Sequence, residues 1–89
     1  MIEIQVRLFG ALRKYEGSQP SVRVEAPAGV TVAAVKERLA SQLRAAHAPF
    51  KDEQLIQDSA IANETQVLQS STVIERSCTL AILPPVCGG

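Results

Sequence analysis

The chain has 89 residues, of which 46% are hydrophobic but only 3% aromatic, so its length and composition predict a single domain with a core of Val, Leu, Ile and Ala. Nine basic and nine acidic residues cancel, and the longest basic cluster is Arg13-Lys14, which argues against nucleic acid or an anionic membrane surface as a partner. No apolar run reaches the roughly 18 residues of a membrane span, and charges alternate through the first residues where a signal peptide would be apolar, so we expect a cytoplasmic protein.

The first 26 residues contain two segments with the period of a strand. From Ile2 to Leu8 the even-numbered residues are apolar and the odd-numbered ones polar, and the same alternation returns from Ser21 to Ala26. This pattern is typical of strands with one buried face. Turn-forming residues lie between the two segments at 16–20, so they are predicted to pair as a hairpin.

A helix is predicted after the break at Pro27-Ala28-Gly29, with Thr31 as its N-cap. Its apolar residues recur at spacings of three and four and should face a sheet: Val32, Val35, Leu39 and Leu43. We expect its polar residues to lie on the opposite side: Lys36, Glu37, Arg38, Gln42 and Arg44. The helix should end near Ala46, and Pro49 prevents further extension.

The second half of the chain has weaker patterns. Residues 50–58 are charged and predicted to be irregular, residues 59–62 are predicted to form a short strand that ends at Asn63, and the run 70–72 fits a turn. The last strand is predicted from Cys78 to Leu83, with Leu80 and Ile82 toward the core. It ends at Pro84 because proline cannot donate a ladder hydrogen bond.

The order strand, strand, helix, short strand, strand places one helix across one face of a mixed sheet. A right-handed crossover through the helix favours a later strand that lies parallel to the first. These features predict an α+β fold of the ubiquitin-like β-grasp type over residues 1–83, followed by a flexible C-terminal diglycine tail over residues 84–89.

The tail combines stiff and permissive residues. Pro84-Pro85 has fixed φ angles that favour an extended strut. Gly88 and Gly89 lack the Cβ atoms that would obstruct a narrow active-site channel. The reactive group would then be the carboxylate of Gly89 itself.

Other residues suggest no catalytic or metal-binding site. His47 has no second group at a telling spacing and is expected to be an ordinary exposed residue, and the acids at 52, 53 and 58 form only a loose cluster. Cys78 and Cys87 lack the spacing of a zinc or redox site, so no metal is predicted.

Three stretches carry a family resemblance: VRLFGALRKYEG near the start, IANET after the middle and LPPVCGG at the end. Together they resemble the molybdopterin synthase small-subunit branch of the MoaD/ThiS family of ubiquitin-like sulfur carriers, and the PPV before the last three residues points to that branch. The resemblance implies that Gly88 and Gly89 form the reactive end of a sulfur-donating subunit. This subunit would bind no cofactor and contribute no catalytic side chain of its own.

The resemblance also implies the partners of this chain. In the family, an E1-like adenylating enzyme uses ATP and magnesium to activate the terminal carboxylate, and a sulfur donor system converts it to a thiocarboxylate. The large synthase subunit, in a heterotetramer, then receives the tail. Sulfur is delivered there to cyclic pyranopterin monophosphate during molybdenum cofactor biosynthesis.

We expect the sheet face opposite the helix to dock on these partners. The predicted contacts are residues at the end of the first strand and around the tail: Phe9, Ile82, Leu83, Pro84, Pro85, Val86 and Cys87. Phe9 has a rival assignment as a core residue of the first hairpin. Such docking would combine an apolar anchor near the tail with polar contacts or strand addition around it.

Three positions depart from the family pattern. Arg76-Ser77-Cys78 stands where the family commonly has an Asp-Gly-Asp turn, and Ile82-Leu83 replaces an aromatic pair. Cys87 replaces a small residue without a thiol; it is either a tolerated small side chain or a group that forms a disulfide or accepts a sulfane sulfur.

Three alternative functions remain open at the level of the sequence. The chain could carry sulfur for another pathway, such as thiamin or cysteine synthesis. It could be a ubiquitin-like modifier whose activated Gly89 is attacked by a protein lysine. It could also be an interaction module whose diglycine is incidental.

Overall fold

The computed structural model describes residues 1–17 and 21–85. Its elements follow in chain order: β1 (Ile2–Leu8), the 3-10 helix η1 (Gly10–Tyr15), β2 (Val22–Ala26), β3 (Val30–Thr31), α1 (Val32–Ala46), α2 (Glu53–Asp58), β4 (Ala60–Ala62), β5 (Val67–Leu68), β6 (Val73–Ile74) and β7 (Cys78–Leu83). The predicted strands at both ends and the predicted helix are confirmed. Thr31 caps α1 as expected, since its Oγ1 accepts a hydrogen bond from the N–H of Ala34 at 3.2 Å.

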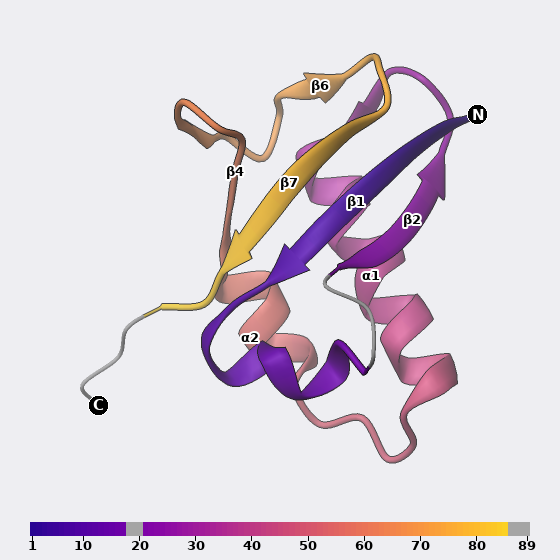
Figure 1. Ribbon diagram of the computed structural model, residues 1–89, viewed down its shortest axis with the longest axis vertical. Helices are drawn as coiled ribbons and strands as arrows, with labels where there is room; N and C mark the ends of the chain where they lie inside the picture. Colours follow the sequence, from indigo (N-terminus) through magenta and orange to yellow (C-terminus); the bar gives the residue numbers. More distant parts are fainter. Residues whose placement is uncertain (18–20, 86–89) are drawn as a thin grey trace.

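The main sheet has the strand order β2-β1-β7-β4-β5. β1 pairs antiparallel with β2 and parallel with β7, while β4 pairs antiparallel with both β7 and β5. β3 and β6 form a separate two-stranded sheet. α1 crosses behind the main sheet in Figure 1, so one sheet face is covered and the other is open. This arrangement is the ubiquitin-like β-grasp that the order of elements predicts.

The core is aliphatic and lies between the main sheet and α1. The inward residues of the central strands and the apolar stripe of the helix are all buried: Ile4, Val6, Leu8, Leu80, Ile82, Val32, Val35, Leu39 and Leu43. Removing such side chains from water stabilises a fold by about 25 cal/mol per Å² of apolar surface. The period-two and period-3.6 patterns therefore identify the core residues of both layers.

Lys36 does not lie on the solvent side predicted for it. Only 9% of this residue is exposed, and its Nζ donates hydrogen bonds to the carbonyl oxygens of Gln57 at 3.0 Å and Ser59 at 2.9 Å. Carbonyl groups at the end of a helix lack partners within the helix, and a cation is favoured there. Lys36 therefore joins α1 to the C-terminal end of α2.

Residues 50–58 are predicted to be irregular, and this prediction is wrong for part of the segment. Residues 53–58 form α2, which buries Ile56. Residues 10–15 form η1, which buries Leu12 in a segment for which no element is predicted. The two-residue strands β3, β5 and β6 are also absent from the sequence-based prediction.

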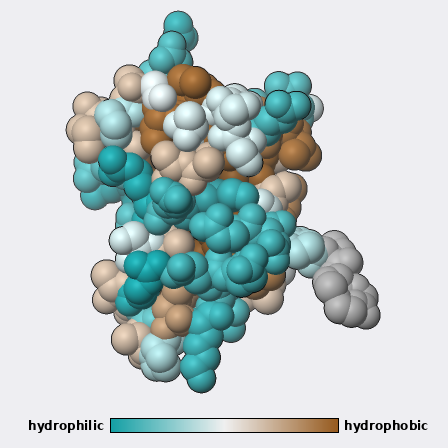
Figure 2. Space-filling view, turned by 180° about the vertical axis from the view of Figure 1, so that it is seen from behind, coloured by the Kyte–Doolittle hydropathy of each residue, from teal (hydrophilic) through white to brown (hydrophobic). Residues whose placement is uncertain are grey.

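The helix side of the molecule is polar across its middle (Figure 2). Figure 2 looks at this side, which faces away from the viewer in Figure 1, and shows hydrophilic side chains across its middle. Arg38 and Gln42, both exposed on α1, donate hydrogen bonds to the backbone carbonyls of Glu25 and Arg23 in β2. Among the helices of the described ranges, none is long and apolar enough to cross a membrane.

Candidate functional site: the tail base and the open sheet face

The C-terminal segment leaves the sheet at its centre. β7 lies between β1 and β4, and the parallel register of β1 with β7 pairs Leu8 with Ile82 at its last position. Beyond this pair the chain continues as Phe9-Gly10 on one side and Leu83-Pro84 on the other, and Figure 1 shows both segments at the same end of the sheet. We call these four residues the tail base.

Gly10 lies beside the ring of Pro84. Its φ is +58°, in the left-handed region that disfavours most side chains, and a Cβ built on it would lie 3.4 Å from Cγ and 3.8 Å from Cδ of Pro84. The turn leads from β1 into η1, where the N–H of Leu12 donates to the carbonyl of Phe9 at 3.1 Å. Glycine thus suits the left-handed backbone of this turn, which runs beside the first residue of the predicted tail.

The structure separates the predicted docking residues. Ile82 is fully buried, because it shares the helix-facing side of the sheet with its partners on both neighbouring strands, so its assignment to the docking surface is wrong. Leu83 points to the other face and is 37% exposed. Pro84 is half-buried and Pro85 is exposed. The predicted residues Val86, Cys87, Gly88 and Gly89 lie outside the described residues.

Phe9 lies at the surface end of β1. It is half-buried, does not belong to the core cluster, and its ring centroid is 5.4 Å from the guanidinium carbon of Arg7. A guanidinium at this distance from an aromatic ring is attracted to it electrostatically. Of the two assignments for Phe9, the position in the hairpin core is therefore wrong, and the ring is available at the tail base.

Small apolar residues cover the open sheet face beside the tail. The pairing registers place on one face, opposite to the buried side chains of β4 and β7, a group that we call the apolar patch: Ala60, Ala62, Val67, Ala81 and Leu83. Of its two larger side chains, Val67 is 64% exposed and Leu83 is 37% exposed. A patch of this kind, bordered by polar residues, resembles the core and rim of a protein interface.

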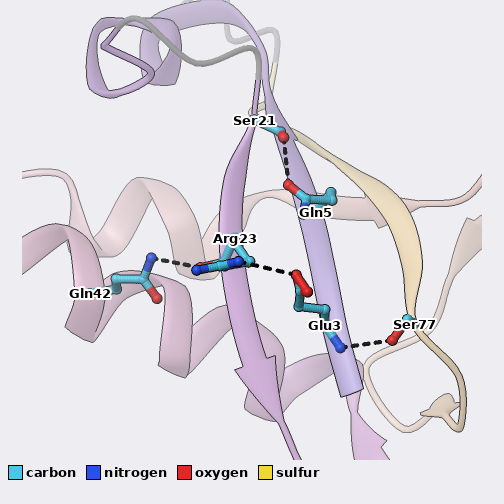
Figure 3. A network of polar contacts seen from close by, with 6 residues as sticks. All are labelled: Glu3, Gln5, Ser21, Arg23, Gln42 and Ser77. Carbon is cyan, nitrogen blue, oxygen red and sulfur yellow. Dashed lines mark hydrogen bonds and ion pairs between the residues drawn. The ribbon is translucent and has the colours of Figure 1, made fainter. Parts of the chain in front are cut away.

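The other half of the open face carries a polar network, shown in Figure 3. Arg23 Nη1 lies 3.3 Å from Glu3 Oε1, and Ser21 Oγ donates to Gln5 Oε1 at 2.8 Å. These contacts join β1 to β2 across the antiparallel register. The open face therefore changes from charged and hydrogen-bonded on β2 and β1 to small and apolar on β7 and β4.

The turn before β7 forms without the glycine that the family pattern would place there. No non-glycine residue in the described ranges has a positive φ, so Arg76-Ser77-Cys78 forms its turn in ordinary backbone conformations. Ser77 Oγ accepts a hydrogen bond from the N–H of Glu3 at 2.9 Å. This contact ties the start of β7 to the start of β1.

A shallow groove opens where β4 diverges from β7. Their pairing stops at Ala62 and Ala81, and beyond that point a space of about 390 Å³ is lined by Asn63, Glu64, Thr65, Cys78 and Thr79. Burial raises the pKa of the Cys78 thiol above its ordinary value, so this thiol is neutral and weakly nucleophilic at neutral pH. The groove therefore supplies no activated thiol.

A cluster of charged and aromatic residues joins η1 to the segment between α1 and α2. The Tyr15 hydroxyl donates a hydrogen bond to Asp52 Oδ2, and Lys14 Nζ lies 3.0 Å from the same oxygen. The Tyr15 ring packs edge-to-face against His47 and Phe50, so His47 is half-buried instead of simply exposed. Residues 1–17 and 21–85 contain no group of three or more His, Cys, Asp or Glu side chains that could hold a metal ion.

Comparison with known protein families identifies the family of this chain. The model of the ThiS family matches residues 6–89, which includes the tail and its diglycine. The chain belongs to the ThiS family. As a ThiS-family protein, it is of the ubiquitin-like class whose members are sulfur carriers or modifiers. A search of curated proteins finds no match.

Solved structures with the same fold carry the names of small archaeal modifiers and of a molybdopterin converting factor. SAMP1 from Haloferax volcanii has a TM-score of 0.70 at 22% identity, and the alignment covers 98% of this chain and 99% of SAMP1. The small archaeal modifier protein 1 from Methanosarcina acetivorans is 26% identical with a TM-score of 0.67, covering 100% and 98%. A Pyrococcus furiosus protein that carries the name molybdopterin converting factor, subunit 1, has a TM-score of 0.70 at 16% identity, covering 97% and 100%.

Proposed function

We propose that this ThiS-family protein is a sulfur carrier whose Gly89 carboxylate is activated and converted to a thiocarboxylate. The observation that carries the proposal is the continuity of the family match through the diglycine, at the end of a segment that leaves the central strand β7 through Pro84-Pro85. The proline pair restricts the backbone at the start of the tail, and the apolar patch lies beside this point.

The proposed chemistry needs only a terminal carboxylate from this chain. In an E1-like enzyme with ATP and magnesium, the Gly89 carboxylate attacks the α-phosphorus of ATP, which forms the acyl-adenylate and releases pyrophosphate. A sulfur nucleophile then attacks the carbonyl carbon and expels AMP, a far better leaving group than the carboxylate oxygen. The activating enzyme and the sulfur donor system supply the acid–base groups, and this chain supplies the terminus and the docking surface.

Within this chemistry we propose the role of small subunit of molybdopterin synthase. The PPV before the last three residues supports it, as does the shared fold of the Pyrococcus furiosus protein that carries the molybdopterin converting factor name. In this role the tail enters the large subunit of a heterotetramer, where two carriers deliver the two sulfurs that cyclic pyranopterin monophosphate requires. A carrier for another sulfur pathway would differ in its partners and not in its terminus.

The second candidate function is that of a protein modifier. It is favoured by the 26% identity, over the whole chain, with a Methanosarcina acetivorans protein named a small archaeal modifier. Both functions begin with the same acyl-adenylate. They diverge when a lysine amine, instead of sulfur, displaces AMP and leaves an isopeptide bond.

The experiment is intact-mass measurement after incubation with ATP, magnesium, the cognate adenylating enzyme and a sulfide source, followed by fragmentation. Exchange of one oxygen for sulfur at Gly89 is expected, and deletion of Gly88 and Gly89 should abolish it without unfolding the domain. Loaded carrier added to the large subunit and cyclic pyranopterin monophosphate then tests the pathway. An unmodified Gly89 in the presence of a demonstrably active enzyme would falsify the carrier function, whereas isopeptide-linked conjugates in cell extract would favour the modifier.

A further inference from the structure

We propose that Gly10 is a positioning residue that sets the direction in which the tail leaves the domain, through its packing against Pro84. The inference rests on the proposed function, because it concerns how a tail that must enter a partner enzyme is presented. Gly10 touches neither substrate nor reacting atoms in this scheme. It acts through Pro84, five positions before Gly89, where the family match ends.

The position of Gly10 beside Pro84 follows from the parallel pairing of β1 with β7. Leu8 and Ile82 are paired and buried, so the backbone on both strands is held by the core up to that point. Two residues further along each strand, Gly10 and Pro84 lie side by side, with the place of a missing Cβ only 3.4 Å from Cγ of the proline ring. Pro84 is thus supported on the side of η1.

The direction of the tail depends on this support. The ring of Pro84 fixes its own φ, and the following Pro85 restricts the ψ of Pro84 to extended values, so the orientation of the ring also determines where Pro85 points. With the place of the missing Gly10 Cβ 3.4 Å from its Cγ, the ring is bounded on this side by the turn at Gly10 and has a restricted set of orientations. A tail that is already directed loses less conformational freedom when it docks, which lowers the concentration at which an activating enzyme is half-saturated.

Gly17 provides a matched control for Gly10. Its φ is +66°, so a side chain there meets the same backbone preference, yet no described heavy atom lies within 4 Å of the place where its Cβ would be. Asn is the suitable replacement at both positions because it tolerates the left-handed region better than other residues with a Cβ. Gly10→Asn and Gly17→Asn therefore differ mainly in whether the new side chain meets Pro84.

The kinetic test compares the two variants as carriers in the adenylation reaction. Gly10→Asn should raise the KM for the carrier about fivefold with kcat within about twofold, whereas Gly17→Asn should leave both within about twofold of the wild type. Pro84→Ala should also raise KM, and adding Gly10→Asn to Pro84→Ala should raise it no further. Equal KM values for the two Asn variants, or an unchanged effect of Gly10→Asn in the Pro84→Ala background, would overturn the proposal.

A second readout requires no enzyme and separates this inference from the proposed function. In NMR spectra of the wild type and of Gly17→Asn, nuclear Overhauser effects should connect the Hα protons of Gly10 with the ring protons of Pro84. Their absence from the wild type overturns the inference even if Gly89 is activated normally. If these effects are present but no adenylating enzyme activates the wild type, the packing is established and the proposed function is overturned. If Gly10→Asn does not fold, Gly10→Ala replaces it in the kinetic comparison.

Discussion

At the residue scale, the contact among Lys14, Tyr15 and Asp52 has a defined electrostatic character. The hydrogen bond from the Tyr15 hydroxyl, and then that from Lys14, hold the pKa of the Asp52 carboxyl below its ordinary value. Burial, followed by the hydrogen bond to Asp52, raises the pKa of Tyr15. The cluster is therefore most stable when Asp52 is ionised and Tyr15 is neutral, which holds across the neutral range.

Replacement of Asp52 with Asn should lower the free energy of unfolding by about 1 kcal/mol at pH 7, the typical loss of one such hydrogen bond. Because the folded-state pKa of Asp52 is depressed, its contribution is present above the unfolded-state pKa of about 3.9 and is lost as pH falls through the lower folded-state value. Urea denaturation of the wild type and the variant between pH 7 and pH 2 measures this. The two curves should converge in acid, and Asp58→Asn, on the exposed end of α2, serves as the control.

The tertiary contacts of single residues such as Gly10 and Lys36 could not be predicted from the sequence. The stretch LFGALRKY contains Gly10, but nothing in its spacing shows that Pro84 lies against it, because the contact arises from a strand pairing more than seventy positions apart in the chain. The helical pattern places Lys36 on the polar side of the helix for a similar reason. A helical pattern reports residue type, whereas the carbonyl groups that accept from Lys36 belong to α2.

At the element scale, β7 presents opposite properties on successive residues. Ile82 is fully buried against the core, and Leu83 is 37% exposed beside the tail. Ile82→Ala should destabilise the domain by about 2–5 kcal/mol, the usual cost of such a truncation in a core, and lower its melting temperature accordingly. Leu83→Ala should lower the free energy of unfolding by under about 1 kcal/mol but raise the KM of the adenylating enzyme for this carrier. Calorimetry and carrier kinetics on the same two variants check the contrast, which fails if Leu83→Ala is the more destabilising.

The joint between α1 and α2 depends on a lysine. Lys36→Met keeps most of the aliphatic stem but leaves the carbonyls of Gln57 and Ser59 without their donor, so we expect a loss of about 1–3 kcal/mol. Lys51→Met, at an exposed position, should change stability by no more than about 0.5 kcal/mol. Chemical denaturation of both variants measures the difference. Equal stabilities would mean that the Lys36 contacts contribute nothing.

The predictability of each element follows its length and its share of the core. β1, β7 and α1 each bury at least two side chains at regular spacing, and the sequence predicts their bounds correctly. η1 and α2 have six residues each and bury only Leu12 and Ile56, respectively, so they lack a repeated signal. β3, β5 and β6 have two residues each, which is too short for any alternation to appear.

At the scale of the whole molecule, the pairing of β1 with β7 forms the centre of the sheet. Backbone amides in these two strands should exchange with solvent most slowly, by opening of the entire domain, while those of β5 and β6 should exchange at least about tenfold faster through local opening. Hydrogen exchange followed by NMR measures both. Exchange in β7 as rapid as in β5 would show that the end of the chain opens independently of the rest.

The candidate site shows the same division between local and long-range information. The proline pair and the diglycine are adjacent in sequence and point directly to the tail, whereas the apolar patch is assembled from three strands. Its alanines on β4 and β7 carry no signal until the register places them on one face with Leu83 and Val67.

The place of β7 between two partners also determines how the domain responds to force. Ladder hydrogen bonds run across the strands, so a pull on the tail along the axis of β7 loads its bonds to β1 and β4 together, in shear, instead of breaking them one after another. In the proposed function, where a partner draws the tail into a channel, the load is shared by the whole centre of the sheet. The tail of the proposed carrier is thus attached where the domain is most resistant to mechanical unfolding.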